Sequence, residues 1–365
     1  MASIEIGRVR PAVAQLPAYR PGKAAEQAEN EHGITGAIKL ASNENPYEPI
    51  PAVVEAISTA AREVNRYSDH RASELRAELA AWLGVEATQV TVGCGSVGLI
   101  QQLFLTYVDP GDEVVVPWRS FEVYPIDTML MGAEMVPVPL VEGGFDLDAL
   151  VEAVTAQTKL VLIATPNNPT GRATSTEALR QMLGQIPSTV MVLIDEAYRE
   201  FVDPRFGDPV HDLLPHFPNV VVTRSMSKAY GLAGLRVGYL VGHRDVVAEI
   251  DKTLLPFAVN ALAQAAALAA IRHRPAYQPA IDLIIRERSR VVDALSEDGW
   301  KLFPTQANFV YLELGDRTAA VAVELERRGV VTRPFVGEGL RVTIGSADEN
   351  DRFLGALREV AASPR

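Results

Sequence analysis

Seven short runs rich in valine and isoleucine constrain the fold of this sequence more than any other feature. They cover residues 89–92, 113–116, 134–137, 159–164, 190–194, 220–223 and 237–241. Each run is almost continuously apolar, which is typical of strands buried on both faces of a mostly parallel sheet. Amphipathic helical patterns lie between them, at 97–107 and 175–183 for example. The pattern predicts a large α/β domain with a mostly parallel, seven-stranded sheet between helices.

The chain has 365 residues, which is too long for one ordinary core, so two domains are expected. Residues 1–45 are rich in proline, glycine and asparagine and predict an N-terminal arm that completes part of a small domain. Residues 46–260 predict the large domain. Residues 261–365 predict an interdomain helix and a small α+β domain. In this last part we expect strands at 309–312, 330–332 and 341–344, and helices at 318–328 and 350–361.

The net charge of -12 argues against a nucleic-acid partner or an anionic membrane surface. Cys94 is the single cysteine, so no internal disulfide can form, and no Cys/His cluster suggests a metal site. The first residues lack the apolar stretch of a signal peptide, and no apolar run is long enough to span a bilayer. A soluble cytoplasmic protein is expected.

Four polar segments follow predicted strands directly: 93–96, 166–171, Asp195 and 225–228. In open α/β sheets, ligands bind beyond the carboxyl ends of the strands. Because these ends meet at one edge of the sheet, the four segments predict one shared site.

Lys228 ends the segment Ser-Met-Ser-Lys after one of these strands. An amine in a desolvated pocket that contains another cation has a lowered pKa and can form an imine. Ser225, Ser227 and Arg236 could bind a phosphate through charge-assisted hydrogen bonds. The alternative is a surface loop with an incidental basic pair.

Asp195 suits the ring nitrogen of a pyridinium cofactor, which needs an anion to stay protonated. Tyr198, three residues later, could donate to the phenolate oxygen of such a ring, although a helix N-cap would also explain Asp195. Asn168 lies in Asn-Asn-Pro-Thr-Gly. That segment is either only a turn, with a cis proline bond as one option, or a second donor to the same oxygen.

Three further features are weaker. Gly95 and Ser96 stand between a strand and a helix, where free N–H groups can bind phosphate. Arg341 alternates with the apolar residues of its strand. It is therefore either an arginine exposed to solvent or a bidentate ligand of a substrate carboxylate. Tyr67 and Tyr19 have no function that spacing indicates, and packing is the default interpretation.

Four segments together resemble the fold-type I, pyridoxal-phosphate-dependent aminotransferases. They are 41–46 (ASNENP), 167–171 (NNPTG), 195–198 (DEAY) and 227–236 (SKAYGLAGLR). The resemblance runs from about residue 10 to residue 361, with the motifs in family order, and it is strongest to the histidinol-phosphate aminotransferase-like branch.

The resemblance implies a role for each matching residue. Lys228 resembles the lysine that forms the imine and moves the proton, Asp195 the partner of the pyridine nitrogen, and Tyr198 and Asn168 the partners of the phenolate oxygen. Further implied cofactor contacts are Phe121 on the ring, and Ser225, Ser227, Arg236 and backbone groups of Gly95 and Ser96 at the phosphate. Tyr67 resembles a tyrosine that reaches the phosphate of the neighbouring subunit, which implies a homodimer with shared sites. The implied substrate contacts are Arg341 for the anionic end, Arg333 as a second anion ligand, and Tyr19, Asn43 and Asn308.

Some positions depart from histidinol-phosphate aminotransferases, which usually carry acidic residues where Val97 and Gly98 stand. Segments 93–97, 118–122 and 256–260 resemble instead the actinobacterial aromatic (phenylalanine) aminotransferases. The expected reaction is reversible, ping-pong transamination of phenylalanine, tyrosine or tryptophan with a 2-oxo acid such as 2-oxoglutarate. The alternatives are a histidinol-phosphate aminotransferase, a pyridoxal-phosphate decarboxylase of similar fold, and a binding module without catalysis.

Overall fold

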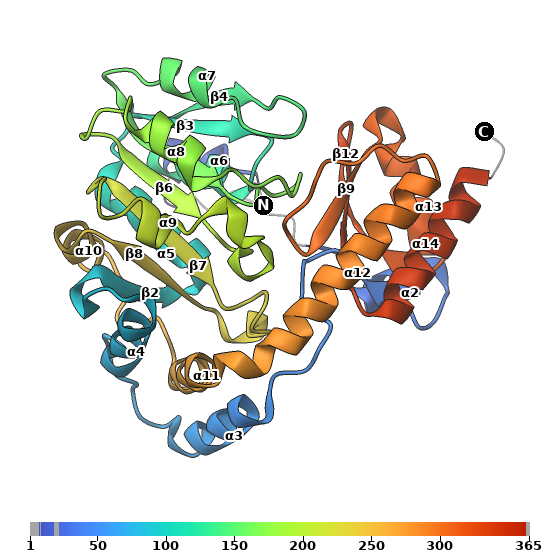
Figure 1. The fold of residues 1–365 in the computed structure, drawn as a ribbon, viewed down its shortest axis with the longest axis horizontal. Helices are drawn as coiled ribbons and strands as arrows, with labels where there is room; N and C mark the ends of the chain where they lie inside the picture. The colour runs from blue at the N-terminus through green and yellow to red at the C-terminus, as the bar shows by residue number, and fades with distance from the viewer. Residues whose placement is uncertain (1–6, 8, 18–21, 363–365) are drawn as a thin grey trace, which may run out of the picture.

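The computed structural model describes residues 7, 9–17 and 22–362 of the chain. It consists of a large α/β part and a smaller α+β part. The long helix α12 (Gln278–Glu297) runs from one part to the other (Figure 1).

The large part contains a seven-stranded sheet, as the apolar runs predict. Its strand order is β2-β8-β7-β6-β5-β3-β4, and β8 alone runs in the direction opposite to the other six strands. The strands are β2 (Val90–Cys94), β3 (Glu113–Trp118), β4 (Glu134–Pro139), β5 (Thr158–Ala164), β6 (Met191–Asp195), β7 (Val220–Ser225) and β8 (Val237–Gly242). Each predicted run overlaps one strand, and their ends differ by at most two residues.

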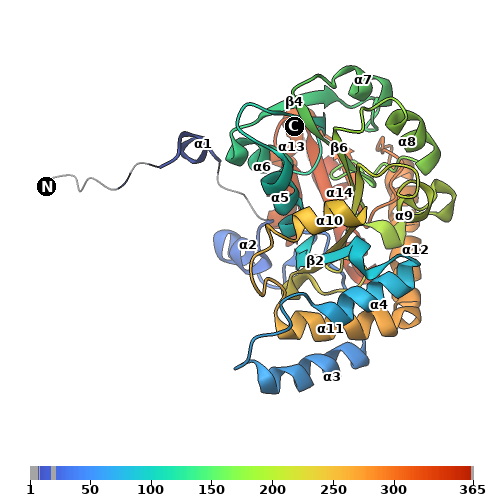
Figure 2. The same cartoon turned by 90° about the vertical axis from the view of Figure 1, so that its left-hand side faces the viewer.

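Both faces of this sheet are buried. Successive side chains of a strand point to opposite faces, and here both sets lie in hydrophobic clusters. Val114 and Val116 pack in a cluster with α5 (Gly95–Tyr107), whereas Val115 packs in the main core on the other face. Leu179 of α8 (Thr176–Leu183) belongs to that main core. Figure 2 shows α5 and α8 on opposite sides of the sheet. This burial explains why the runs are continuously apolar.

The smaller part is built on a three-stranded antiparallel sheet of order β11-β12-β9, so the α+β expectation is confirmed. Its strands are β9 (Phe309–Glu313), β11 (Arg333–Phe335) and β12 (Gly339–Thr343), and its other helices are α13 (Thr318–Arg327) and α14 (Ala347–Ala362). β11 was not expected from the sequence, because it is three residues long and contains a proline.

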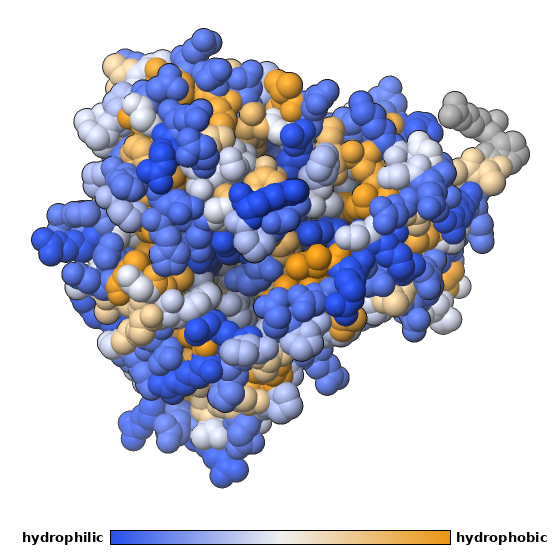
Figure 3. Space-filling model, in the orientation of Figure 1, coloured by the Kyte–Doolittle hydropathy of each residue, from blue (hydrophilic) through white to orange (hydrophobic). Residues whose placement is uncertain are grey.

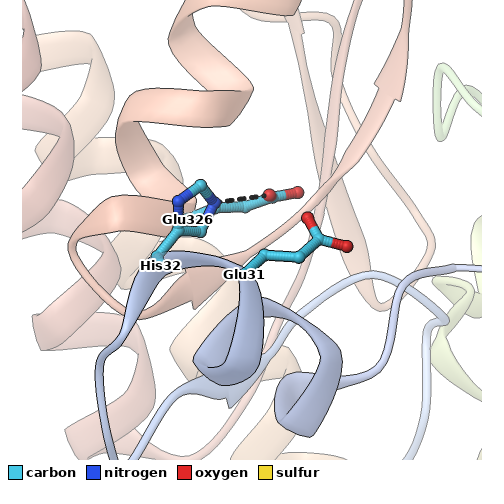
Figure 4. A group of neighbouring side chains, drawn as sticks. All are labelled: Glu31, His32 and Glu326. Atoms are coloured by element: carbon cyan, nitrogen blue, oxygen red, sulfur yellow. Dashed lines mark hydrogen bonds and ion pairs between the residues drawn. The ribbon is translucent and has the colours of Figure 1, made fainter.

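The N-terminal segment packs on the smaller part. β1 (Ile38–Lys39) pairs in parallel with β10 (Val330–Val331), and α2 (Ala25–His32) lies against α13. The Lys23 ammonium lies 2.5 Å from Glu31 and 2.6 Å from Glu326, whose carboxylate is also 3.3 Å from His32. Figure 4 shows these acidic residues and the histidine converging from the two helices. We interpret this cluster as an ion-pair network between them, since a lysine cation already bridges its carboxylates.

These contacts support the expected division into 1–45, 46–260 and 261–365, which stays a prediction. The remaining helices lie mostly around the large sheet: α1 (Pro11–Ala14), α3 (Pro51–Ala60), α4 (Ser73–Leu83), α6 (Val123–Met131), α7 (Leu147–Glu152), α9 (Pro209–Asp212), α10 (Arg244–Ile250) and α11 (Ala261–Arg272). Within the described residues, no helix combines the length and apolar character needed to cross a membrane. The face in Figure 3 is mostly hydrophilic with scattered apolar patches.

Candidate active site

A pocket lies where the carboxyl ends of the large sheet's parallel strands face the small antiparallel sheet. Its walls come from segments that are far apart in the sequence. The predicted site residues that line it are Asn43, Ser96, Phe121, Asn168, Asp195, Tyr198, Ser225, Ser227, Lys228, Arg236, Arg333 and Arg341. The shared edge of the sheet therefore brings most of the expected residues together.

Lys228 extends into this pocket from a loop anchored at both ends. β7 and β8 pair up to Ser225 and Gly238, and the Leu232 amide donates to the Met226 carbonyl at 3.0 Å inside the loop. The Lys228 Nζ donates to the Ser42 carbonyl at 3.0 Å. Burial and, to a smaller extent, the nearby Arg341 guanidinium lower the pKa of the Lys228 ammonium to about 7. An amine with this pKa is partly neutral near pH 7 and can act as a nucleophile or a base.

Asp195 ends β6 and is 4% exposed. Its Oδ2 accepts from the Tyr124 hydroxyl at 2.9 Å and its Oδ1 from the Thr223 hydroxyl at 3.3 Å. Burial raises the pKa of the Asp195 carboxyl to about 6. Among the residues that the structure describes, no lysine or arginine forms an ion pair with it, so a cationic ligand atom would suit this position. The turn that follows, Arg199–Phe201, has Tyr198 as its N-cap, so Asp195 is not a helix cap.

Tyr198 is buried, and its hydroxyl accepts from the Asn43 side-chain amide at 2.9 Å. Asn43 adopts a left-handed conformation with φ 53°, and its backbone amide donates to the Thr343 hydroxyl at 2.9 Å. Asn43 thus supports Tyr198 in addition to lining the pocket. The bond between Asn168 and Pro169 is cis, the option that the turn composition allowed.

Arg341 of β12 closes the side of the pocket opposite the large sheet. Its Nη1 donates to Asn168 Oδ1 at 2.5 Å and its Nη2 to the Ala41 carbonyl at 2.7 Å. The guanidinium is therefore held from two segments, and the side chain is 8% exposed in relative terms. An arginine positioned in this way can bind a carboxylate in a defined orientation.

The N-terminus of α5 and the lysine loop form a cradle for an anion. Arg236 Nη1 donates to the Ser227 hydroxyl at 3.3 Å, and the Ser227 amide donates to the Ser225 hydroxyl at 3.1 Å. A Cβ added to Gly95 would lie 2.5 Å from Arg236 Nη2, so only glycine lets the guanidinium approach this helix end so closely. The helix N-terminus, the arginine and the hydroxyls together suit a phosphate group.

Three predicted residues that the structure describes, Gly95, Asn308 and Tyr67, do not line the pocket. Asn308 is buried behind it and donates to the Asn43 carbonyl at 3.2 Å. Tyr67 is 84% exposed and stacks on Phe257 with ring centroids 4.4 Å apart. Tyr19 lies outside the described residues.

Three residues contribute to the site without a predicted role: Tyr124, Ser42 and Glu122. Tyr124 donates to Asp195, Ser42 accepts from Lys228, and Glu122 forms an ion pair with Arg333 at 2.6 Å. Tyr124 and Glu122 follow the end of β3, and that position beyond a strand was the available signal. The Ser42 contact uses a backbone carbonyl, which leaves no trace in the residue type.

Comparison with known proteins identifies the family. The profile of the family "Aminotransferase class I and II" matches residues 35–357, which is most of the chain. The chain belongs to the class I and II aminotransferases.

Several members of this aminotransferase family are similar over nearly their whole length. The aromatic amino acid aminotransferase of Thermobifida fusca is 48% identical over 96% of both chains. That of Streptomyces coelicolor is 46% identical over 96% of this chain and 97% of its own. Among solved structures, the histidinol-phosphate aminotransferase of Sinorhizobium meliloti in complex with pyridoxal-5'-phosphate has a TM-score of 0.89 and 28% identity, with 98% of each chain covered.

The cofactor of this aminotransferase family is pyridoxal phosphate, and the pocket suits it in three ways. The Lys228 amine has a lowered pKa, the buried Asp195 carboxylate forms no ion pair with the described residues, and the cradle at Arg236 suits a phosphate. These groups come from adjacent strand ends, as one planar ligand with an aldehyde, a ring nitrogen and a phosphate requires.

Proposed function

We propose that the protein is an aromatic-amino-acid aminotransferase. It would transfer the amino group of phenylalanine, tyrosine or tryptophan to a 2-oxo acid such as 2-oxoglutarate. Similarity to named relatives at 46–48% identity over 96% of the chain supports the substrate class. The observation that carries the reaction is Lys228, a partly buried amine with a pKa of about 7 among residues that suit this cofactor.

In this proposal, each residue of the pocket performs one task. Pyridoxal phosphate, when bound, supplies an aldehyde carbon for amino groups and a ring that withdraws electrons from the substrate Cα. Lys228 holds the cofactor between turnovers, and its freed amine then removes the proton from Cα. Asp195 keeps a proton on the ring nitrogen. Tyr198 and Asn168 would bind the ring's phenolate oxygen, and Phe121 would stack against the ring.

Arg341 would decide the reaction type by holding the substrate carboxylate in place. Because its guanidinium is fixed by Asn168 and by the Ala41 carbonyl, the carboxylate stays in one orientation. That orientation favours loss of the Cα proton over loss of carbon dioxide, which argues against the decarboxylase alternative.

The homodimer is also a proposal. Tyr67 is 84% exposed, its stacking partner Phe257 is 38% exposed, and Leu255 nearby is 70% exposed. Large apolar side chains exposed together are typical of an interface. We expect light scattering to give a dimer mass and Tyr67→Phe to weaken cofactor retention. A monomer that keeps full activity would contradict the shared site.

The decisive experiment compares two amino donors with the same acceptor. With 2-oxoglutarate as acceptor, we expect kcat/KM for phenylalanine to exceed that for histidinol phosphate by at least about 100-fold, since the pocket would be built for an uncharged ring. The opposite ratio would establish the histidinol-phosphate alternative. Product formation without any amino acceptor would point to the decarboxylase.

A further inference from the structure

Glu122 and Arg333 form an ion pair inside the pocket, on the side formed by the small sheet. Arg333 Nη2 lies 2.6 Å from Glu122 Oε2, and both residues line the pocket. The Arg333 side chain is 12% exposed and the Glu122 side chain 34%, so the pair is partly shielded from water. A partly desolvated pair of this kind influences any charged group that enters the same space.

Arg333 and Arg341 stand directly opposite each other on β11 and β12. Opposite residues of an antiparallel pair project from the same face of the sheet. Two guanidiniums would therefore give this side of the pocket a strong positive potential. Arg341 is the proposed ligand of the substrate carboxylate, and the charge of Arg333 is balanced by Glu122.

The position of Glu122 indicates that its side chain serves the pocket rather than its own helix. Glu122 is the N-cap of α6, a position where a carboxylate can accept from free helix amides, but its side chain makes no such bond. It pairs instead with Arg333, which is 211 residues away in the sequence. Its neighbour Phe121 lines the same pocket.

We propose that Glu122 is a specificity-determining residue, which neutralises Arg333 at the side-chain end of the substrate pocket. This inference rests on the proposed aminotransferase function. An anionic side chain would have to displace the Glu122 carboxylate from Arg333, whereas an aromatic ring leaves the pair intact beside Phe121 and Phe335. The pair thus disfavours donors with carboxylate or phosphate side chains and tolerates apolar ones.

The test is the variant Glu122→Gln, which keeps the shape of the side chain and removes its charge. We expect kcat/KM for glutamate or histidinol phosphate, relative to phenylalanine, to rise about tenfold or more. The gain should come mainly from a lower KM for the anionic donor. The KM for 2-oxoglutarate should fall as well, because its second carboxylate no longer competes with Glu122.

A second ion pair provides the matched control. Arg119 and Glu338 join the same loop to the same hairpin, but neither lines this pocket. Glu338→Gln should leave the donor ratio within about twofold of wild type, since the lost charge does not face the substrate. Glu122→Asp, which keeps the carboxylate, should retain most of the wild-type preference.

The double variant Glu122→Gln/Arg333→Leu should lose the gained activity toward anionic donors. An unchanged donor ratio in Glu122→Gln would overturn the inference while the wild type still transaminates phenylalanine. Failure of the wild type to use phenylalanine would instead overturn the proposed function. If Glu122→Gln does not fold, the single variant Arg333→Leu is the test. Its kcat/KM for anionic donors, relative to phenylalanine, should fall below that of the wild type, and an unchanged ratio would overturn the inference.

Discussion

The floor and the mouth of the pocket differ in the elements that carry their residues and in the contacts that hold those residues. The floor comprises Lys228, Asp195 and Tyr198, which extend from or just beyond the strand ends of the large sheet. The mouth comprises the ion pair Glu122–Arg333, which joins the loop after β3 to the small sheet, while the pair Arg119–Glu338 joins the same two parts outside the pocket lining. Floor residues are supported by short contacts to buried groups, whereas mouth residues meet across two parts of the molecule.

Because of this difference, we assign the chemical step to the floor residues and the choice of substrate to the mouth residues. At the floor, burial shifts the pKa of Lys228 down to about 7 and that of Asp195 up to about 6. At the mouth the charges are paired and partly exposed, and such pairs contribute little to stability. We therefore expect floor variants to abolish turnover and variants of the Glu122–Arg333 pair to change which substrate is preferred.

Lys228→Ala should have the largest effect. Without the amine there is no group to hold the cofactor covalently or to remove the Cα proton, so kcat should fall by at least about 1000-fold. Single-turnover and steady-state kinetics with phenylalanine would measure this loss. Lys252→Ala, at an exposed lysine paired with Glu249, is the control and should behave as wild type. Residual activity within tenfold of wild type would remove Lys228 from its assigned role.

Asp195→Asn comes next. The amide cannot balance a positive charge on the ring nitrogen, so kcat should fall by about 100-fold while the fold persists. Tyr124→Phe removes only the hydroxyl that donates to Asp195 Oδ2. We expect it to reduce kcat by less than about tenfold, because the carboxylate remains. Equal losses in both variants would show that the hydrogen bond and not the charge is essential.

The pH dependence of cofactor attachment is a third test, which concerns the lowered pKa of Lys228. The Lys228 pKa is lowered to about 7, mainly by burial and then by Arg341, so the amine is neutral above that pH and protonated below it. The rate at which apo-protein regains the visible absorbance of bound cofactor should fall as pH drops below about 7. Arg341→Leu removes a nearby cation, which raises the Lys228 pKa and moves this decline to higher pH.

The same shift has a consequence for stability. The folded-state pKa of Lys228 lies below its ordinary value of 10.5, so the unfolded chain binds more protons between these two pH values. The contribution of Lys228 to the free energy of unfolding should therefore rise from about pH 7 upward and be lost as pH falls through about 7. Denaturant unfolding of apo-protein, compared with Lys228→Met, would measure it. The opposite slope would contradict the pKa shift.

The smallest effect is expected for Glu338→Gln, just outside the pocket lining. The Arg119–Glu338 pair is partly exposed, with 25% and 38% side-chain exposure, respectively, so its loss should change kcat/KM for phenylalanine by less than about threefold. Steady-state kinetics and the thermal unfolding temperature would check this. A loss as large as that of Asp195→Asn would erase the distinction between the floor and the ion pairs that join the two parts.

The sequence predicted the floor far better than the mouth. Asp195 and Lys228 each follow an apolar strand, and the convergence of parallel strand ends placed them together before any contact was known. Arg333 belongs to no such pattern, because β11 was too short to be recognised. Glu122 follows β3, but its partner lies in the small sheet. Their pairing depends on how the two parts pack, which periodicity does not encode. The hydrogen bond from Asn43 to Tyr198 escaped prediction for the same reason.

The reversal of chain direction at β8 has a kinetic consequence. Lys228 sits in a loop whose two ends are joined by the β7–β8 ladder, with Ser225 opposite Gly238. A ping-pong enzyme must release its cofactor from this amine and recapture it in every cycle. Such a short tether keeps the amine at a high effective concentration near the carbon that it must attack again. Recapture then requires only a local rearrangement of the Lys228 side chain, and no movement of the strands that hold its loop.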